Sequence, residues 1–262
     1  MIKKLFSQLL KQSSSFALAV LCLSLIVNSQ STQEKKISEN NLTDETYLRQ
    51  QESEGLKLSF LKKMSAFGFD NLIADWTMLQ FLQYFGDSEA RDITGYSLSA
   101  DYLEVITKND PLFSRAYMVI SPASSMFAGT PERTVELMNR GLAKMSPDIT
   151  DAYYVWLYKG VDEILFLGDL QEAKKSYQIS ANWASKAGNE QIAESASGTV
   201  EFLATKPDVR QAQVGTWFLV WNNTKDERIR QLAETKIESV GGELKIDPDG
   251  IVKAIPPKID KS

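Results

Sequence analysis

Helical spacing of apolar residues, interrupted at short intervals by Gly, Pro and Asp, constrains the fold of this chain more than any other feature. From about residue 56 to residue 238, nearly every segment between these breaks has apolar side chains three or four positions apart. The segment 69–85 is the most apolar of all. We expect its buried side chains to include Leu72, Trp76, Leu79 and Phe81. The sequence therefore predicts an all-α domain over residues 55–240.

The later helices come in pairs that are joined by short turns. Their predicted spans are 99–107, 111–127, 131–145, 152–167, 170–187, 190–203, 208–221 and 225–238. Marker residues recur about every 34 to 37 positions, which is typical of a solenoid of antiparallel helix hairpins. Small residues such as Gly160 and Ala173 would let the two helices of a hairpin approach closely. Trp156 and Tyr177 would fill the gap to the next hairpin, and Gly168 would begin the turn.

One stretch of the chain carries a family resemblance. The segment DAYYVWLYKGVDEILFLGDLQEAKKSYQISA resembles a tetratricopeptide repeat (TPR) at Trp156, Gly160, Gly168, Ala173 and Tyr177. It departs from the family's pattern by one extra residue between Gly160 and Gly168. The resemblance covers about residues 68–205, and the whole string also resembles uncharacterised exported repeat proteins of cyanobacteria. Those resemblances imply a helical-repeat fold in the periplasm or the thylakoid lumen.

In TPR proteins the first helices of successive hairpins line a concave groove. The resemblance implies that the groove residues here are Phe113, Ala116, Tyr154, Leu157 and Val161. An apolar groove flanked by acidic residues suits a peptide or the exposed end of a membrane protein. Asn71 and Asp75 share a helix face, and they are either part of this recognition site or paired internally, for instance Asp75 with Arg115.

The first 29 residues have the layout of a targeting segment. Three lysines and no acidic residue precede the apolar run Phe16–Val27. This pattern predicts either a cleaved signal peptide or an N-terminal membrane anchor, with the rest of the chain exported. Cys22 lies within the apolar run and is interpreted as an apolar filler. Residues 30–54 are polar and lack an apolar stripe, and they are expected to form a linker that can include a frayed helix.

The C-terminal segment 241–262 changes character. Short apolar runs lie on either side of Asp247-Pro248-Asp249-Gly250, which predicts a two-stranded β-hairpin. The spacing of Asp247 and Asp249 does not match a calcium-binding loop, because Gly250 comes too early and no acidic residue closes the loop.

Composition argues against most enzyme classes. The chain has 262 residues, no histidine, one cysteine and a formal net charge of −5, which becomes −8 without the three N-terminal lysines. Imidazole-based catalysis and metal binding are thereby excluded, no phosphate-binding glycine loop occurs, and we expect neither cofactor nor metal. The acidic exported body also argues against nucleic acid as a partner. Lys159 and Glu163, four residues apart, predict a surface ion pair.

These observations predict a non-catalytic scaffold or assembly factor that binds another protein on the lumenal or periplasmic side of a membrane, and two alternatives remain open. One alternative is a hydrolase of cell-wall glycan or peptide, with a carboxylate pair from separate helices. It requires a deep cleft that holds two carboxylates, one of them with a raised pKa. The other alternative is a structural protein that associates with itself through the edge of the C-terminal hairpin.

Overall fold

The computed structural model describes residues 43–258, so the predicted targeting segment and Cys22 lie outside the described residues. The chain divides into two compact units, residues 1–47 and residues 48–262, and only residues 43–47 of the first unit are described. The helices are α2 (Asp44–Lys63), α3 (Asp70–Gly86), α4 (Ser88–Thr94), α5 (Ser99–Asn109), α6 (Ser114–Pro122), η1 (Ala123–Phe127), α7 (Pro131–Leu142), α8 (Ala152–Asp162), η2 (Glu163–Leu167), α9 (Leu170–Lys186), α10 (Glu190–Ala204), α11 (Arg210–Asn222) and α12 (Glu227–Ser239). The strands β1 (Glu243–Ile246) and β2 (Val252–Ile255) follow.

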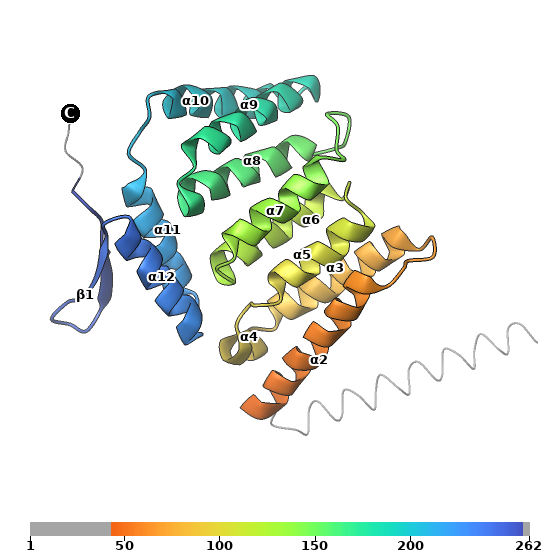
Figure 1. Ribbon diagram of the computed structural model, residues 1–262, viewed down its shortest axis with the longest axis horizontal. Coiled ribbons are helices and arrows are strands. Elements are labelled where there is room, and N and C mark those ends of the chain that lie inside the picture. The colour runs from red at the N-terminus through yellow and green to blue at the C-terminus, as the bar shows by residue number, and fades with distance from the viewer. Residues whose placement is uncertain (1–42, 259–262) are drawn as a thin grey trace, which may run out of the picture. The chain divides into compact units, whose positions relative to one another are not determined.

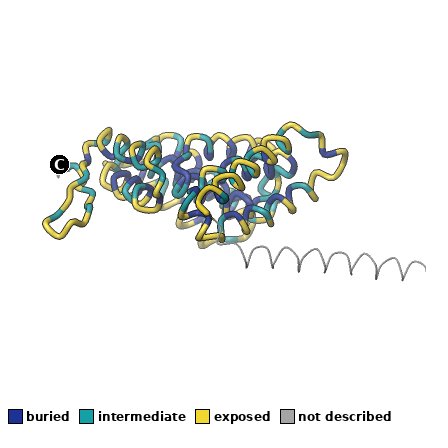
Figure 2. The backbone as a smooth tube through the Cα atoms, turned by 90° about the horizontal axis from the view of Figure 1, so that it is seen from below, coloured by how far each residue is buried: buried dark blue, intermediate teal, exposed yellow. Residues whose placement is uncertain are grey.

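Within the second unit the helices form antiparallel hairpins that stack side by side (Figure 1). We call α3, α6, α8 and α10 the first-row helices, and the helices α2, α5, α7 and α9 the second-row helices. Buried residues concentrate between the packed helices, whereas exposed residues lie on the outer surfaces (Figure 2). The predicted all-α hairpin fold with a C-terminal β-hairpin is therefore confirmed.

Glycines allow the close helix contacts that were expected within the hairpins. A Cβ atom on Gly160 of α8 would lie 2.6 Å from the ring of Tyr177 on α9. A Cβ atom on Gly141 of α7 would lie 1.8 Å from the hydroxyl oxygen of Tyr117 on α6. Tyr177 thus packs inside its own hairpin, where the sequence had suggested that it fills the gap to the next one. Gly168 has a φ of +69°, and Asp169 after it caps α9 by accepting a hydrogen bond from the Glu172 N–H at 3.0 Å.

Two consecutive first-row helices end in a π-helical turn, η1 after α6 and η2 after α8. A π turn closes its hydrogen bonds from residue i to residue i+5, so it accommodates one residue more than an α-helical turn. This geometry accounts for the additional residue between Gly160 and Gly168, because η2 lies between these two glycines. In η1 the π turn begins directly after Pro122, whose ring nitrogen has no hydrogen to donate.

The hairpin of α11 and α12 packs on the π turns and does not extend the row beyond α10. Trp217 of α11 donates a hydrogen bond to the Phe166 carbonyl at 3.4 Å, and the two rings meet edge to face. Lys236 of α12 reaches Glu132 of α7 at 2.8 Å. Strands β1 and β2 pair antiparallel, with Leu244 opposite Ala254, and both of these side chains pack against the α11–α12 cluster.

Residues 44–54 of the expected linker belong to helix α2 (Asp44–Lys63). Side-chain hydrogen bonds hold this polar segment against α4 and α5, so its helix does not depend on an apolar stripe. Gln51 donates to the Thr94 carbonyl and accepts from Arg91, both at 3.1 Å. Glu54 accepts a hydrogen bond from the Tyr102 hydroxyl at 3.0 Å. The short helix α4 was not predicted either.

Candidate functional site

The outer face of α3 carries more exposed large apolar side chains than any other helix among the described residues. Its side chains Leu72, Trp76, Leu79 and Leu82 are 63, 60, 57 and 49% exposed. The opposite face of the helix packs into the core through Ala74, Thr77, Phe81 and Tyr84. The prediction of burial was right for Phe81 and wrong for Leu72, Trp76 and Leu79. Because α3 is apolar nearly all round, its sequence alone did not reveal which face would be covered.

A shallow hollow lies on this face of α3. It has a volume of about 430 Å³ and is lined by Trp76, Leu79, Gln80, Leu82 and Gln83. All five residues belong to one helix, so the hollow is a groove along the helix surface and not an enclosed cavity. A long apolar side chain from a binding partner would fit against the Trp76 ring here.

Two aromatic residues project from the turn that precedes α3. Phe67 is 84% exposed and has a φ of +50°, and Phe69 is 64% exposed. A positive φ is uncommon for a bulky residue other than glycine and costs of the order of 1 kcal/mol or more. Among the described residues, 43–258, no burial of the Phe67 ring offsets this cost.

Asn71 and Asp75 lie on the exposed side of α3, as the functional interpretation requires. Asp75 follows Leu72 by three residues and precedes Leu79 by four, so it lies beside both on the outer face. The internal pairing of Asp75 with Arg115 does not form, because Arg115 pairs with Asp151 at 3.7 Å.

The remaining predicted groove residues are less accessible. Ala116 is fully buried in the core between α5, α6 and α8 and is wrong as a contact residue, because its small side chain serves helix packing. Phe113 is half-buried against the same core. Leu157 and Val161 are half-buried against the cluster formed by α9 and α10. Tyr154 is half-buried, and its ring lies 4.5 Å from that of Tyr153.

A buried polar centre joins α8, η2 and α9. Lys159 and Glu163 form the predicted ion pair, but the two residues are only 3% and 2% exposed, so the expectation of a surface pair is wrong. The Ser176 hydroxyl accepts a hydrogen bond from the Lys159 ammonium at 2.9 Å and donates one to the Glu163 carboxylate at 2.6 Å. The three polar side chains therefore satisfy one another inside the hairpin, as buried charges require.

Asp162 lies beside this centre and connects the two π-turn regions. Its carboxylate accepts a hydrogen bond from the Ser125 hydroxyl of η1 at 2.6 Å. Burial is the main cause that raises the pKa of Asp162 to about 7; the Ser125 hydrogen bond opposes this rise, and the negative charge of Glu163 adds to it. Because Asp162 is 5% exposed, a bulky substrate cannot reach its carboxylate in this conformation.

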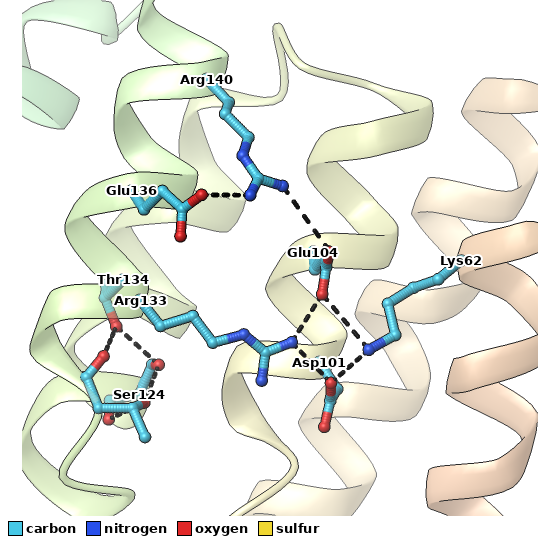
Figure 3. A network of polar contacts seen from close by, with 9 residues as sticks. Lys62, Asp101, Glu104, Ser124, Arg133, Thr134, Glu136 and Arg140 are labelled. Carbon is cyan, nitrogen blue, oxygen red and sulfur yellow. Dashed lines mark hydrogen bonds and ion pairs between the residues drawn. The ribbon is translucent and has the colours of Figure 1, made fainter.

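An ion-pair network connects three second-row helices (Figure 3). Its members are Lys62 of α2, Asp101 and Glu104 of α5, and Arg133, Glu136 and Arg140 of α7. The Arg133 guanidinium lies 2.7 Å from Asp101 and 2.6 Å from Glu104. Partial burial opposes ionisation, but hydrogen bonds from Lys62 and Arg133 lower the pKa of both carboxyl groups. The network fastens α2, α5 and α7 together.

A basic pocket of about 520 Å³ adjoins this network. Its lining residues are Lys62, Glu104, Thr107, Lys108, Leu137, Arg140 and Lys144. Helices α2, α5 and α7 each carry basic residues in the last turn, where cations stabilise the partial negative charge of a helix C-terminus. Lys108 does so directly by donating to the Met64 carbonyl at 2.8 Å. This arrangement accounts for the positive charge of the pocket without a bound anion.

The turn of the β-hairpin uses its carboxylate internally. The Asp247 side chain accepts hydrogen bonds from the N–H groups of Asp249 and Ile251 at 3.0 and 2.9 Å and pairs with Lys253 at 2.8 Å. Within residues 43–258, no group of three or more Cys, Asp or Glu side chains is placed to hold a metal ion. Over the same residues, no helix is long and apolar enough to cross a bilayer.

Comparison of the chain with protein-family models, with curated proteins and with solved structures found no match.

Proposed function

We propose that this chain is a non-catalytic scaffold or assembly factor that binds a segment of another protein through its first-row helices. The exposed outer face of α3 carries the proposal. Four large apolar side chains on one helix are accessible to a partner, and Asn71 and Asp75 add polar contacts beside them. Apolar surfaces with polar residues at their margin are typical of protein-binding sites.

The burial and internal pairing of Asp162 and Glu163 support this proposal over the hydrolase alternative. A carboxylate pair that cleaves a glycan or peptide must contact its substrate on both sides of the scissile bond. Asp162 has the raised pKa that such a pair requires, but it is 5% exposed. Its neighbour Glu163 is 2% exposed and already binds Lys159 and Ser176.

The N-terminal sequence supports a location at the exported side of a membrane, in the periplasm or the thylakoid lumen. Basic residues followed by the apolar run Phe16–Val27 would direct residues after 30 across the membrane, with or without cleavage. The binding surface would then face a membrane complex during or after its assembly. Neither a cofactor nor a nucleic acid forms part of this proposal.

The test is cross-linked co-isolation of the full chain from detergent-solubilised membranes, with mass spectrometry and an untagged control. We expect a stoichiometric partner set that is lost when Trp76 and Leu79 are both changed to Glu. The matched control is Leu219→Glu, because Leu219 is 46% exposed on α11 and is not part of the α3 surface. Recovery of the wild-type chain without a partner would overturn the proposal, as would equal loss in the control.

A further inference from the structure

Exposed apolar side chains concentrate at the α2–α3 end of the helix row. Among the described residues, nine of the sixteen exposed large apolar side chains lie between residues 48 and 82. They are Leu48, Leu56, Phe60, Phe67, Phe69, Leu72, Trp76, Leu79 and Leu82. Stacked helix repeats need a polar outer face on their terminal units to stay soluble. This end of the row lacks such a face.

The position of α3 explains why its apolar face is open. In Figure 1, α2 and α3 lie at the end of the helix row that is opposite α10. Helix α6 packs against α5 and α8, whereas the inner face of α3 packs against α5 and its outer face remains exposed. The open face extends from Leu72 to Leu82, which is about 15 Å or three helical turns. A helix of similar length would therefore match it.

Charge on α3 selects among the possible occupants of this face. Its sequence, DNLIADWTMLQFLQYFG, contains two aspartates and no cation. Insertion into lipid would bury the Asp75 carboxylate without a counter-charge, which is strongly unfavourable. Contact with the α3 of a second copy would bring only acidic groups together. A partner helix with a Lys or Arg on its apolar side avoids both penalties.

We propose that the outer face of α3 docks a helix of another protein that has an apolar stripe and a single Lys or Arg placed to pair with Asp75. Leu72, Trp76 and Leu79 contact the apolar stripe, and the exposed rings of Phe67 and Phe69 extend the contact beyond the start of α3. The backbone strain at Phe67 is then offset by burial of its ring in the complex. This inference rests on the proposed scaffold function and specifies the chemistry of its partner.

The test uses the full chain and two designed 20-residue helical peptides. Both peptides carry a Leu stripe at helical spacing, and they differ at one central position beside the stripe, which is Lys in one and Glu in the other. In fluorescence anisotropy titrations, we expect the Lys peptide to bind at least tenfold more tightly than the Glu peptide, a difference of about 1.4 kcal/mol. Asp75→Lys should reverse this preference, whereas Asp249→Lys on the β-hairpin should leave it unchanged.

Changing Trp76 and Leu79 together to Ser should weaken both peptides at least tenfold while leaving thermal unfolding unchanged, since both side chains are exposed. Equal binding of the two peptides, or an Asp75→Lys variant that keeps the original preference, overturns the inference. If these peptides fail while the Glu variants of Trp76 and Leu79 still abolish co-isolation of a natural partner, the scaffold function stands and only the proposed helix chemistry fails.

Three further measurements detect other occupants, and each positive result overturns the inference. The first is flotation with phosphatidylcholine vesicles that is lost in the Trp76/Leu79 double Ser variant. The second is a sedimentation mass that rises with concentration in the wild type and not in that variant. The third is maleimide labelling of Leu79→Cys in a Cys22→Ser background, measured in the absence of peptide. Slow labelling would show that another part of the chain covers α3. Fast labelling that the Lys peptide slows supports the inference.

Discussion

Replacement of Asp162 by Asn should change how the stability of the protein depends on pH. In the fold, the pKa of Asp162 rises from 3.8 to about 7 because the carboxyl group is buried. The folded state therefore binds this proton more tightly than the unfolded state, so the contribution of Asp162 to stability falls as pH rises from about 4 to about 7 and is constant above that. The shift of about 3 pKa units corresponds to a loss of about 4 kcal/mol.

The assay is urea unfolding of both proteins between pH 4 and pH 8, followed by tryptophan fluorescence. Other carboxyl groups, such as Asp101 and Glu104, titrate alike in both proteins, so the difference between the two curves isolates Asp162. We expect Asp162→Asn to gain up to about 4 kcal/mol relative to the wild type between pH 4 and pH 8. Asp70→Asn, at an exposed carboxylate, is the control. A difference that is the same at pH 4 and pH 8 would refute the reasoning.

Two further changes probe buried packing. Glu163→Gln should cost about 3–5 kcal/mol in the free energy of unfolding, because it leaves the Lys159 ammonium buried without a counter-charge; a loss below 1 kcal/mol by urea unfolding would contradict this. Gly141→Ala should lower stability by about 1–3 kcal/mol, because the added Cβ atom would overlap the Tyr117 hydroxyl. The control is Gly198→Ala in α10, where an added Cβ atom meets nothing within 4 Å, so this change should be neutral or stabilising. Thermal melts of both variants check this, and destabilisation by Gly198→Ala would contradict the packing argument.

The helices and most of their bounds could be predicted from spacing and breaks, but the environment of particular faces could not. Lys159 and Glu163 have the spacing of a surface ion pair, and only the neighbouring Gly160 and the facing Ser176 allow the pair to lie inside a hairpin. The spacing of residues along one helix does not show whether a second helix packs over the face that carries them. The buried centre was therefore missed, although its ion pair was predicted.

The candidate surface was predicted in part. Asn71 and Asp75 were placed on a common face of one helix, and both are exposed there; their role in recognition stays a prediction. The apolar residues around them were expected to be buried, because hydrophobicity predicts burial only where another element is available to cover it. The ordered helix over residues 44–54 was missed for the converse reason, because polar contacts such as that between Glu54 and Tyr102 hold it in place.

The α11–α12 hairpin has a consequence for how the molecule opens. In a simple row of repeats each unit contacts only its neighbours, so unfolding can begin at an end and proceed stepwise. Here Trp217 binds Phe166, 51 residues away, and Lys236 binds Glu132, 104 residues away. These long-range contacts couple α7 and η2 to the C-terminal helices, so these segments should exchange their amide hydrogens in one cooperative event. The outer face of α3 takes part in neither of these contacts, so a partner that binds there would leave them intact.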